Sequence, residues 1–216
     1  MCEQNIAWFT TICQDCHRSL PWHHGCQRCG NTLVLTPQGE TLCQQCLIDP
    51  PAYQRLTAAW HYQPPIDTII SQFKFSERLS WRKFLTQSLR EALTQATYTT
   101  PPDFIIPVPL HRQRLRQRGY NQAHLIAKTL AKTLNLPFKG QLCHRIRATM
   151  PQTELPAEKR SRNVKNAFHI GCSNLNSSTI AIVDDVVTTG STVASLSQAL
   201  LAAGAAQIYI WCLAKT

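Results

Sequence analysis

Acidic residues are scarce in this sequence of 216 residues, with 12 Asp and Glu against 22 Lys and Arg and a formal net charge of +10. This imbalance favours polyanionic partners, such as nucleic acid or phosphorylated ligands. Long apolar runs are also lacking, because serine, glutamine and glycine interrupt the longest tract, residues 193–214, so we expect no membrane insertion. Residues 1–11 contain neither a basic region nor an apolar core. We therefore expect no signal peptide and a cytoplasmic location.

Cysteine is abundant, with ten residues, six of which form C-x-x-C pairs: Cys13/Cys16, Cys26/Cys29 and Cys43/Cys46. Because no export signal precedes them, reduced thiolates on a metal are favoured over disulfides. A redox role is disfavoured because no thioredoxin-like βαβ pattern surrounds the pairs.

Two of these pairs have the spacing of a zinc ribbon. A C-x-x-C turn directs two sulfurs at one point, and two such turns complete a tetrahedral site. We predict structural Zn²⁺ on Cys26, Cys29, Cys43 and Cys46, with a hairpin between the pairs whose first strand covers residues 32–35. Zn²⁺ would drive folding here, because the segment has too few apolar residues for a core of its own.

The remaining pair, Cys13 and Cys16, leaves alternatives open. It could replace either of the other pairs in the zinc site, or form a second site with His17, His23 or His24. For the two histidines that follow Pro21-Trp22, we prefer a solvated turn.

Pro50-Pro51 stiffens the chain after the last cysteine pair and marks a predicted boundary. Residues 1–50 form the cysteine-rich zinc-ribbon module in this interpretation. Residues 51–216 form a larger domain, in which residues 52–100 flank a core at residues 101–216.

The larger domain shows apolar patterns that alternate between strand and helix. Strands are predicted at residues 56–62, 103–110, 180–183 and 207–213, and helices at residues 66–73, 80–96, 121–134 and 193–203. This alternation predicts an α/β fold with a mostly parallel sheet flanked by helices, which binds ligands at the carboxyl ends of its strands. We expect Phe73, Phe75 and Trp81 to pack in the core, with base stacking on single-stranded nucleic acid as the alternative.

Residues 180–192 carry the strongest functional signal. Four apolar residues precede Asp184 and Asp185, and a turn of small residues, Thr188 to Thr192, leads into an amphipathic helix. Amide groups at the helix start, threonine and serine hydroxyls and the helix dipole would together favour a phosphate. The carboxylates could accept from sugar hydroxyls or hold a hydrated Mg²⁺.

This segment resembles the phosphoribosyl-pyrophosphate (PRPP) signature of type I phosphoribosyltransferases. With the cysteine-rich start and the arginine-rich middle, nearly the whole chain resembles the ComF/GntX family of competence-associated, phosphoribosyltransferase-like proteins. The resemblance implies a type I phosphoribosyltransferase-like domain at residues 51–216, behind a small zinc ribbon. It also implies PRPP with Mg²⁺ at Asp184, Asp185, Thr188, Thr189, Gly190, Ser191 and Thr192.

Other anion contacts are expected outside the signature. By resemblance, the turn after the strand at residues 103–110 contacts pyrophosphate through Val108, Pro109, Leu110 and His111. A flexible loop over residues 145–168 would cover the ligand and supply Arg145, Arg147 and Arg160. Next to the pyrophosphate turn lies a run with four arginines and no acid, which are candidates for DNA binding: Arg112, Arg114, Arg116 and Arg118. We expect this run to form an anion-binding surface, with a solvated basic loop as the alternative.

Two functions from different classes follow. The resemblance implies a role in natural transformation, in which the protein handles incoming single-stranded DNA in the cytoplasm with proteins of the DNA-uptake machinery. The alternative is a Mg²⁺-dependent phosphoribosyltransferase with an unidentified acceptor. Purine-salvage members carry an acid at the position of Thr188, which this chain lacks, so the acceptor is not defined by the signature.

Overall fold

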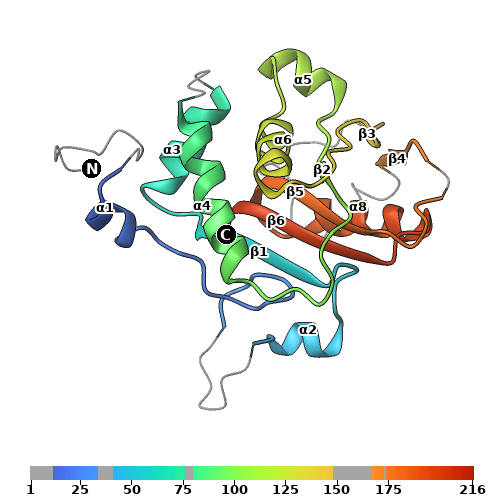
Figure 1. Ribbon diagram of the computed structural model, residues 1–216, viewed down its shortest axis with the longest axis horizontal. Coiled ribbons are helices and arrows are strands. Elements are labelled where there is room, and N and C mark those ends of the chain that lie inside the picture. The colour runs from blue at the N-terminus through green and yellow to red at the C-terminus, as the bar shows by residue number, and fades with distance from the viewer. Residues whose placement is uncertain (1–11, 34–40, 76–79, 148–166, 173) are drawn as a thin grey trace.

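A four-stranded parallel sheet forms the centre of the molecule, in the order β1-β6-β5-β2 (Figure 1). The strands are β1 (Arg55–His61), β2 (Phe104–Pro107), β5 (Thr179–Val187) and β6 (Gln207–Lys215). The computed structural model describes residues 12–33, 41–75, 80–147, 167–172 and 174–216. This sheet confirms the predicted α/β class and its parallel strands.

The central strands are buried on both faces, which explains their almost continuous apolar sequences. Alternate residues of β5 and β6 point to opposite faces and enter two separate cores. Ile180, Ile182, Ile208 and Ile210 belong to one core with helix α8 (Ser191–Ala202). Ala181, Val183, Tyr209 and Trp211 belong to the other core, with α3 (Ile66–Phe75), α4 (Trp81–Gln95) and α6 (Gln122–Leu134). Helices therefore cover both faces, as predicted.

The predicted helices are confirmed within a few residues, and Phe73 is fully buried as expected. The strand predicted to end at residue 183 continues through the acid pair to Val187, because it pairs with β6 as far as Lys215. The strand predicted to reach residue 110 ends at Pro107. The arginine run forms a short helix, α5 (Arg112–Arg118), which His111 caps at its start and Gly119 ends at φ 77°.

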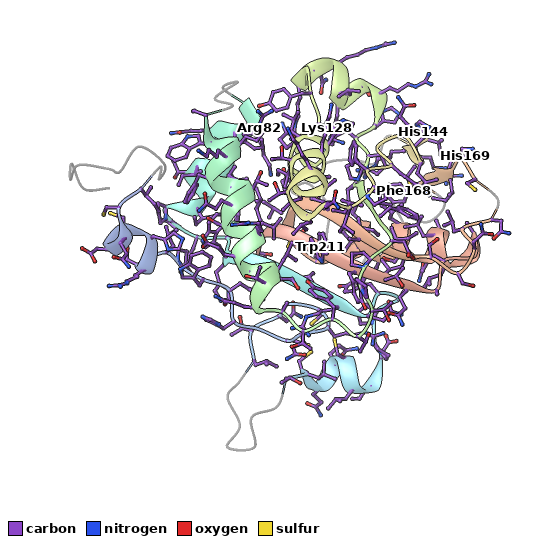
Figure 2. All side chains as sticks on the ribbon, in the orientation of Figure 1. Arg82, Lys128, His144, Phe168, His169 and Trp211 are labelled. Carbon is purple, nitrogen blue, oxygen red and sulfur yellow. The ribbon has the colours of Figure 1, made fainter. Side chains whose placement is uncertain are left out.

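A second, two-stranded antiparallel sheet pairs β3 (Cys143–Arg145) with β4 (Phe168–Ile170). His144 and His169 lie opposite each other in this pair, and Figure 2 shows both above the right-hand part of the main sheet. Most of the predicted flexible loop, residues 148–166, lies outside the described residues. Its two ends belong to these short strands.

The cysteine-rich segment carries two short helices, α1 (Gln14–Arg18) and α2 (Gln44–Ile48). It also covers the outer edge of β1, where His23 N–H donates to the Ala59 carbonyl and Trp22 forms a bridge with Trp60. Ile12 and Leu20 are buried in the same core as Trp60. This segment therefore shares the apolar core of the larger domain.

The strand predicted at residues 32–35 is not formed at Thr32 and Leu33, and residues 34–35 lie outside the described range. The chain turns back just before these residues, because the Asn31 carbonyl accepts the Cys26 N–H at 2.8 Å.

Candidate functional site

The acid pair lies near the carboxyl end of β5. Each carboxylate accepts from the amide that follows it: Asp185 N–H donates to Asp184 Oδ1 at 2.9 Å, and Val186 N–H donates to Asp185 Oδ1 at 2.7 Å. Removal from solvent and the adjacent charge of Asp185 raise the pKa of Asp184 well above its usual range. The second carboxylate therefore opposes ionisation of the first, and a cation beside the pair would relieve this repulsion.

Lys74, at the end of α3, provides a cation that the sequence analysis did not assign to the site. Its Nζ lies 3.0 Å from Asp185 Oδ2, and the two side chains are only 18% and 16% exposed. The signal was a lysine between two aromatics, Phe73 and Phe75, in the part of the chain predicted to flank the core.

The acid pair and Lys74 open into a cavity of about 160 Å³, here called the acid-pair pocket. Residues from several separate stretches of the sequence line it. Those predicted to bind ligand or DNA are Val108, Leu110, Arg114, Arg118, Arg145, Asp184, Asp185 and Thr192. The pocket thus brings the acid pair, the pyrophosphate turn, the arginine run and one end of the flexible loop to one place.

The small-residue turn adjoins the acid pair through a narrow cavity of about 20 Å³, lined by Asp184, Thr188, Gly190 and Thr192. Helix α8 begins at Ser191, and its N-cap, Gly190, has φ 77° and makes no side-chain capping bond. The hydroxyls of Thr189 and Ser191 bond each other at 2.8 Å. Because a helix start favours an anion, this geometry suits a phosphate cradle.

The predicted pyrophosphate turn is held from two sides. Val108 N–H donates to the Val183 carbonyl at 2.8 Å, and the Val108 carbonyl accepts from Asn121 Nδ2 at 2.9 Å. Asn121 also caps α6 through Oδ1. Pro109 and His111 line a neighbouring cavity of about 380 Å³, together with Arg112, His144 and Arg145.

The four arginines of α5 do not form one surface. Arg114 and Arg118 are partly buried and line the acid-pair pocket, whereas Arg112 and Arg116 are exposed and line an outer hollow with His111. Residues four apart share a helix face, so alternate arginines divide into two pairs once the segment is helical. We call His111, Arg112 and Arg116 the outer basic face.

The three arginines predicted to belong to the flexible loop lie in different environments. Arg145 lines the acid-pair pocket, where burial and the charge of Arg114 lower its pKa while Asp184 opposes this effect. Arg147 is exposed. Arg160 lies outside the described residues.

The cysteine quartet predicted from spacing comes together: the Sγ atoms of Cys26, Cys29, Cys43 and Cys46 all lie within 4.8 Å of one another. Tetrahedral Zn–S bonds require sulfurs about 3.8 Å apart. Amides support the thiolates, since Cys43 N–H donates to Cys26 Sγ at 3.2 Å and Asn31 N–H donates to Cys29 Sγ at 3.5 Å. Four thiolates with this support fit Zn²⁺, which would serve as a structural ion here.

Cys13 and Cys16 lie apart from this quartet, so neither replaces one of its members. Over the described ranges they also join no other group of three metal-binding side chains. The solvated turn preferred for the two histidines is right for His24, which is exposed, and wrong for His23. His23 Nε2 hydrogen-bonds the Gly30 carbonyl at 2.7 Å, and burial lowers its pKa.

Within the part of the chain that the structure describes, every helix is too short or too polar to cross a lipid bilayer.

A scan against protein-family models finds no match for this chain. Curated proteins do match it. The chain is 38% identical over 209 residues to DNA utilization protein YhgH of Escherichia coli K12, covering 95% of this chain and 90% of that protein. It is 34% identical over 209 residues to Competence protein F of Haemophilus influenzae, with 94% and 90% covered. Competence protein ComFC of Bacillus subtilis is 24% identical over 207 residues, with 90% and 80% covered.

Among solved structures, a purine phosphoribosyltransferase from Pyrococcus horikoshii aligns over 74% of this chain and 77% of that chain, with a TM-score of 0.32 and 21% identity. That score is low, and the family assignment comes from the relatives above. Two proteins more than 30% identical over nine-tenths of their length share one fold and one family with this chain. The chain belongs to the ComF family, and it joins a parallel α/β domain to an N-terminal cysteine module.

Proposed function

We propose that the acid-pair pocket binds PRPP or a similar ribose phosphate, and that the protein acts on incoming single-stranded DNA in the cytoplasm during natural transformation. One observation carries the ligand proposal. The acid pair, Thr192 of the small-residue turn and cationic side chains of α3, α5 and β3 all line one cavity, although they are far apart in the sequence. Thr188 and Gly190 of the turn line the smaller cavity, which shares Asp184 and Thr192 with the first.

Each part of the pocket has a chemical role in this proposal. Asp184 and Asp185 would accept hydrogen bonds from ribose hydroxyls, and residues 188–192 would hold the 5-phosphate at the start of α8. Arg114, Arg118 and Arg145 would bind the diphosphate, for which guanidinium groups are well suited. Mg²⁺, when bound with the ligand, would neutralise the diphosphate charge.

The DNA proposal is supported by three adjoining hollows that are lined by basic side chains. The acid-pair pocket shares Leu110 and Arg145 with the cavity beside it, and that cavity shares His111 and Arg112 with the outer hollow on α5. Among the residues that the structure describes, no acidic side chain lines the second cavity or the outer hollow. A phosphate backbone could follow this surface through non-specific contacts. Curated relatives named for competence and DNA utilization agree with this role.

A second function, pentosyl transfer from PRPP, is favoured by the same residues of the acid-pair pocket. The arginines would stabilise the departing diphosphate, and the acid pair would hold the ribose in place. Release of pyrophosphate from PRPP in the presence of a nitrogen nucleophile would establish this activity.

The ligand site is tested by thermal unfolding. PRPP with Mg²⁺ should raise the melting temperature of the parent protein, and the double variant Asp184→Asn/Asp185→Asn should lose this shift. Asp15→Asn, a change at an exposed carboxylate, should keep it. If PRPP produces no shift in the parent protein, the ribose-phosphate proposal is wrong.

The biological role needs a separate test. A strain carrying Asp184→Asn/Asp185→Asn should transform at a strongly reduced frequency if the ribose-phosphate site serves DNA handling. A normal transformation frequency would show that natural transformation does not need the acid-pair pocket.

A further inference from the structure

Lys74 occupies a position in the acid-pair pocket that the proposed function does not explain. Its ammonium lies 3.0 Å from Asp185 Oδ2, in a contact that is mostly shielded from solvent. The other oxygen of Asp185 accepts the Val186 N–H, and Asp184 Oδ1 accepts the Asp185 N–H. Amide donors and one ammonium therefore engage oxygens of both carboxylates.

The backbone around Lys74 is fixed by the segment that joins α5 to α6. Tyr120 donates its hydroxyl proton to the Phe73 carbonyl, and Gln122 Nε2 donates to the Lys74 carbonyl at 3.3 Å. Gln122 is only 1% exposed, and its Oε1 accepts from Arg118 at 3.5 Å. The end of α3 is thus tied to the start of α6 and to an arginine of the same pocket.

This arrangement has an electrostatic consequence. A Mg²⁺ ion bound directly by the carboxylates needs oxygen ligands at about 2.0–2.1 Å in octahedral geometry. An ammonium 3.0 Å from Asp185 Oδ2 occupies that space and repels a second cation there. In a partly buried site this repulsion is weakly screened.

We propose that Lys74 is the built-in counter-ion of Asp184 and Asp185, and that it excludes divalent cations from these carboxylates. This inference rests on the proposed ribose-phosphate function and specifies its chemistry. The acid pair with Lys74 recognises the sugar hydroxyls without a metal, and any Mg²⁺ stays on the diphosphate. Lys74 is therefore a positioning residue for the ligand site.

The first experiment uses Mn²⁺ alone as the probe. Zinc-loaded parent protein and Lys74→Met are titrated with Mn²⁺, and binding is followed by loss of the free-ion signal in electron paramagnetic resonance. Lys74→Met should gain one site with at least tenfold higher affinity than the parent protein, and adding Asp185→Asn should remove it. Lys83→Met, which removes an exposed lysine from α4, should behave as the parent protein does.

Lys74→Gln is measured in parallel, in case Lys74→Met folds poorly. Glutamine removes the positive charge but keeps a hydrogen-bond donor near Asp185. Equal Mn²⁺ affinity in the parent protein and in the folded Lys74 variants would overturn the proposal. So would a Mn²⁺ site in the parent protein that Asp185→Asn abolishes.

The second experiment uses ribose 5-phosphate, which has no diphosphate to carry a metal. Its stabilisation of the parent protein should change less than twofold when Mg²⁺ is added. A strict requirement for Mg²⁺ would contradict the role of Lys74, whereas failure of both ribose 5-phosphate and PRPP to bind would contradict the proposed function. The Mn²⁺ titration contains no ribose phosphate, so it tests the exclusion of cations independently of the proposed function.

Discussion

The hydroxyl of Tyr53 lies directly beside Gly190, so that a β-carbon on the glycine would come within 3.3 Å of it. Tyr53 is 3% exposed and packs in the core that contains Val193 and Leu196 of α8. It follows the last cysteine pair closely in the sequence. The chain leaving the cysteine module therefore supports the turn that we propose as the phosphate cradle.

Gly190→Ala should destabilise the protein and weaken ligand binding. A left-handed conformation costs a residue with a β-carbon about 1–2 kcal/mol, and crowding against Tyr53 adds to this at Gly190. Gly119→Ala is the matched control, because Gly119 has the same φ of 77° and no atom of the described residues lies within 4 Å of an added β-carbon. Urea unfolding should show a larger loss for Gly190→Ala, and only this variant should lose the PRPP-induced thermal shift. Equal losses would mean that the contact with Tyr53 has no effect.

Removal of the metal should unfold the cysteine module and lower overall stability. Purified protein should contain one zinc per chain, and Cys43→Ser should lose the metal and melt at a lower temperature. Cys13→Ser should retain zinc, because Cys13 lies outside the quartet. Elemental analysis and thermal unfolding measure both effects. Loss of zinc in Cys13→Ser would assign that cysteine to the site.

Asn121→Ala should remove two interactions at once, the cap of α6 and the bond to the Val108 carbonyl. The cap alone is worth about 1 kcal/mol, so we expect a loss of about 1–2 kcal/mol in urea unfolding. Asn135→Gly provides the comparison at the other end of α6, where φ is 54° and glycine suits the backbone. That variant should change stability by only a few tenths of a kcal/mol. An Asn121→Ala variant as stable as the parent protein would show that the pyrophosphate turn needs no such support.

Asp184 should make stability depend on pH. Its pKa is raised in the folded protein, so the folded state binds more protons than the unfolded state above the ordinary aspartate pKa. This contribution is fully present below the ordinary value and is lost as pH rises through the raised one. Asp184→Asn stays uncharged, so its stability relative to the parent protein should increase as the pH rises from the ordinary aspartate pKa through the raised one. Parallel urea curves test this, and a constant difference between the two proteins would contradict it.

The two faces of α5 should separate DNA binding from ligand binding. Arg112→Ala/Arg116→Ala should weaken binding to single-stranded DNA and lower the slope of log affinity against log salt by roughly 1.4, because each phosphate contact contributes about 0.7. The same variant should keep the PRPP-induced thermal shift, whereas Arg114→Ala/Arg118→Ala should lose it. Arg90→Ala/Lys132→Ala, which removes two exposed cations from other helices, controls for net charge. Fluorescence anisotropy measures the DNA affinities, and identical slopes for all three variants would exclude the outer basic face from DNA binding.

Local sequence patterns determined much of this fold. Alternating strand and helix periods predicted the parallel sheet, because a strand buried on both faces needs a continuous apolar run and a covering helix needs one apolar stripe. The cysteine quartet and the signature at residues 180–192 could also be predicted from the sequence. Each places its functional groups within a short stretch or at a characteristic spacing.

Tertiary structure decided which distant residues meet. Lys74 reaches Asp185 only because the end of α3 is tied to Tyr120 and Gln122. The arginine run forms two surfaces because it is helical. A helix turns by about 100° per residue, so arginines two positions apart point to nearly opposite sides. His23 became partly buried because its segment covers the edge of β1. The sequence thus determined the fold class, the cysteine quartet and the signature strand, whereas packing between distant elements decided how the charges are arranged around that strand.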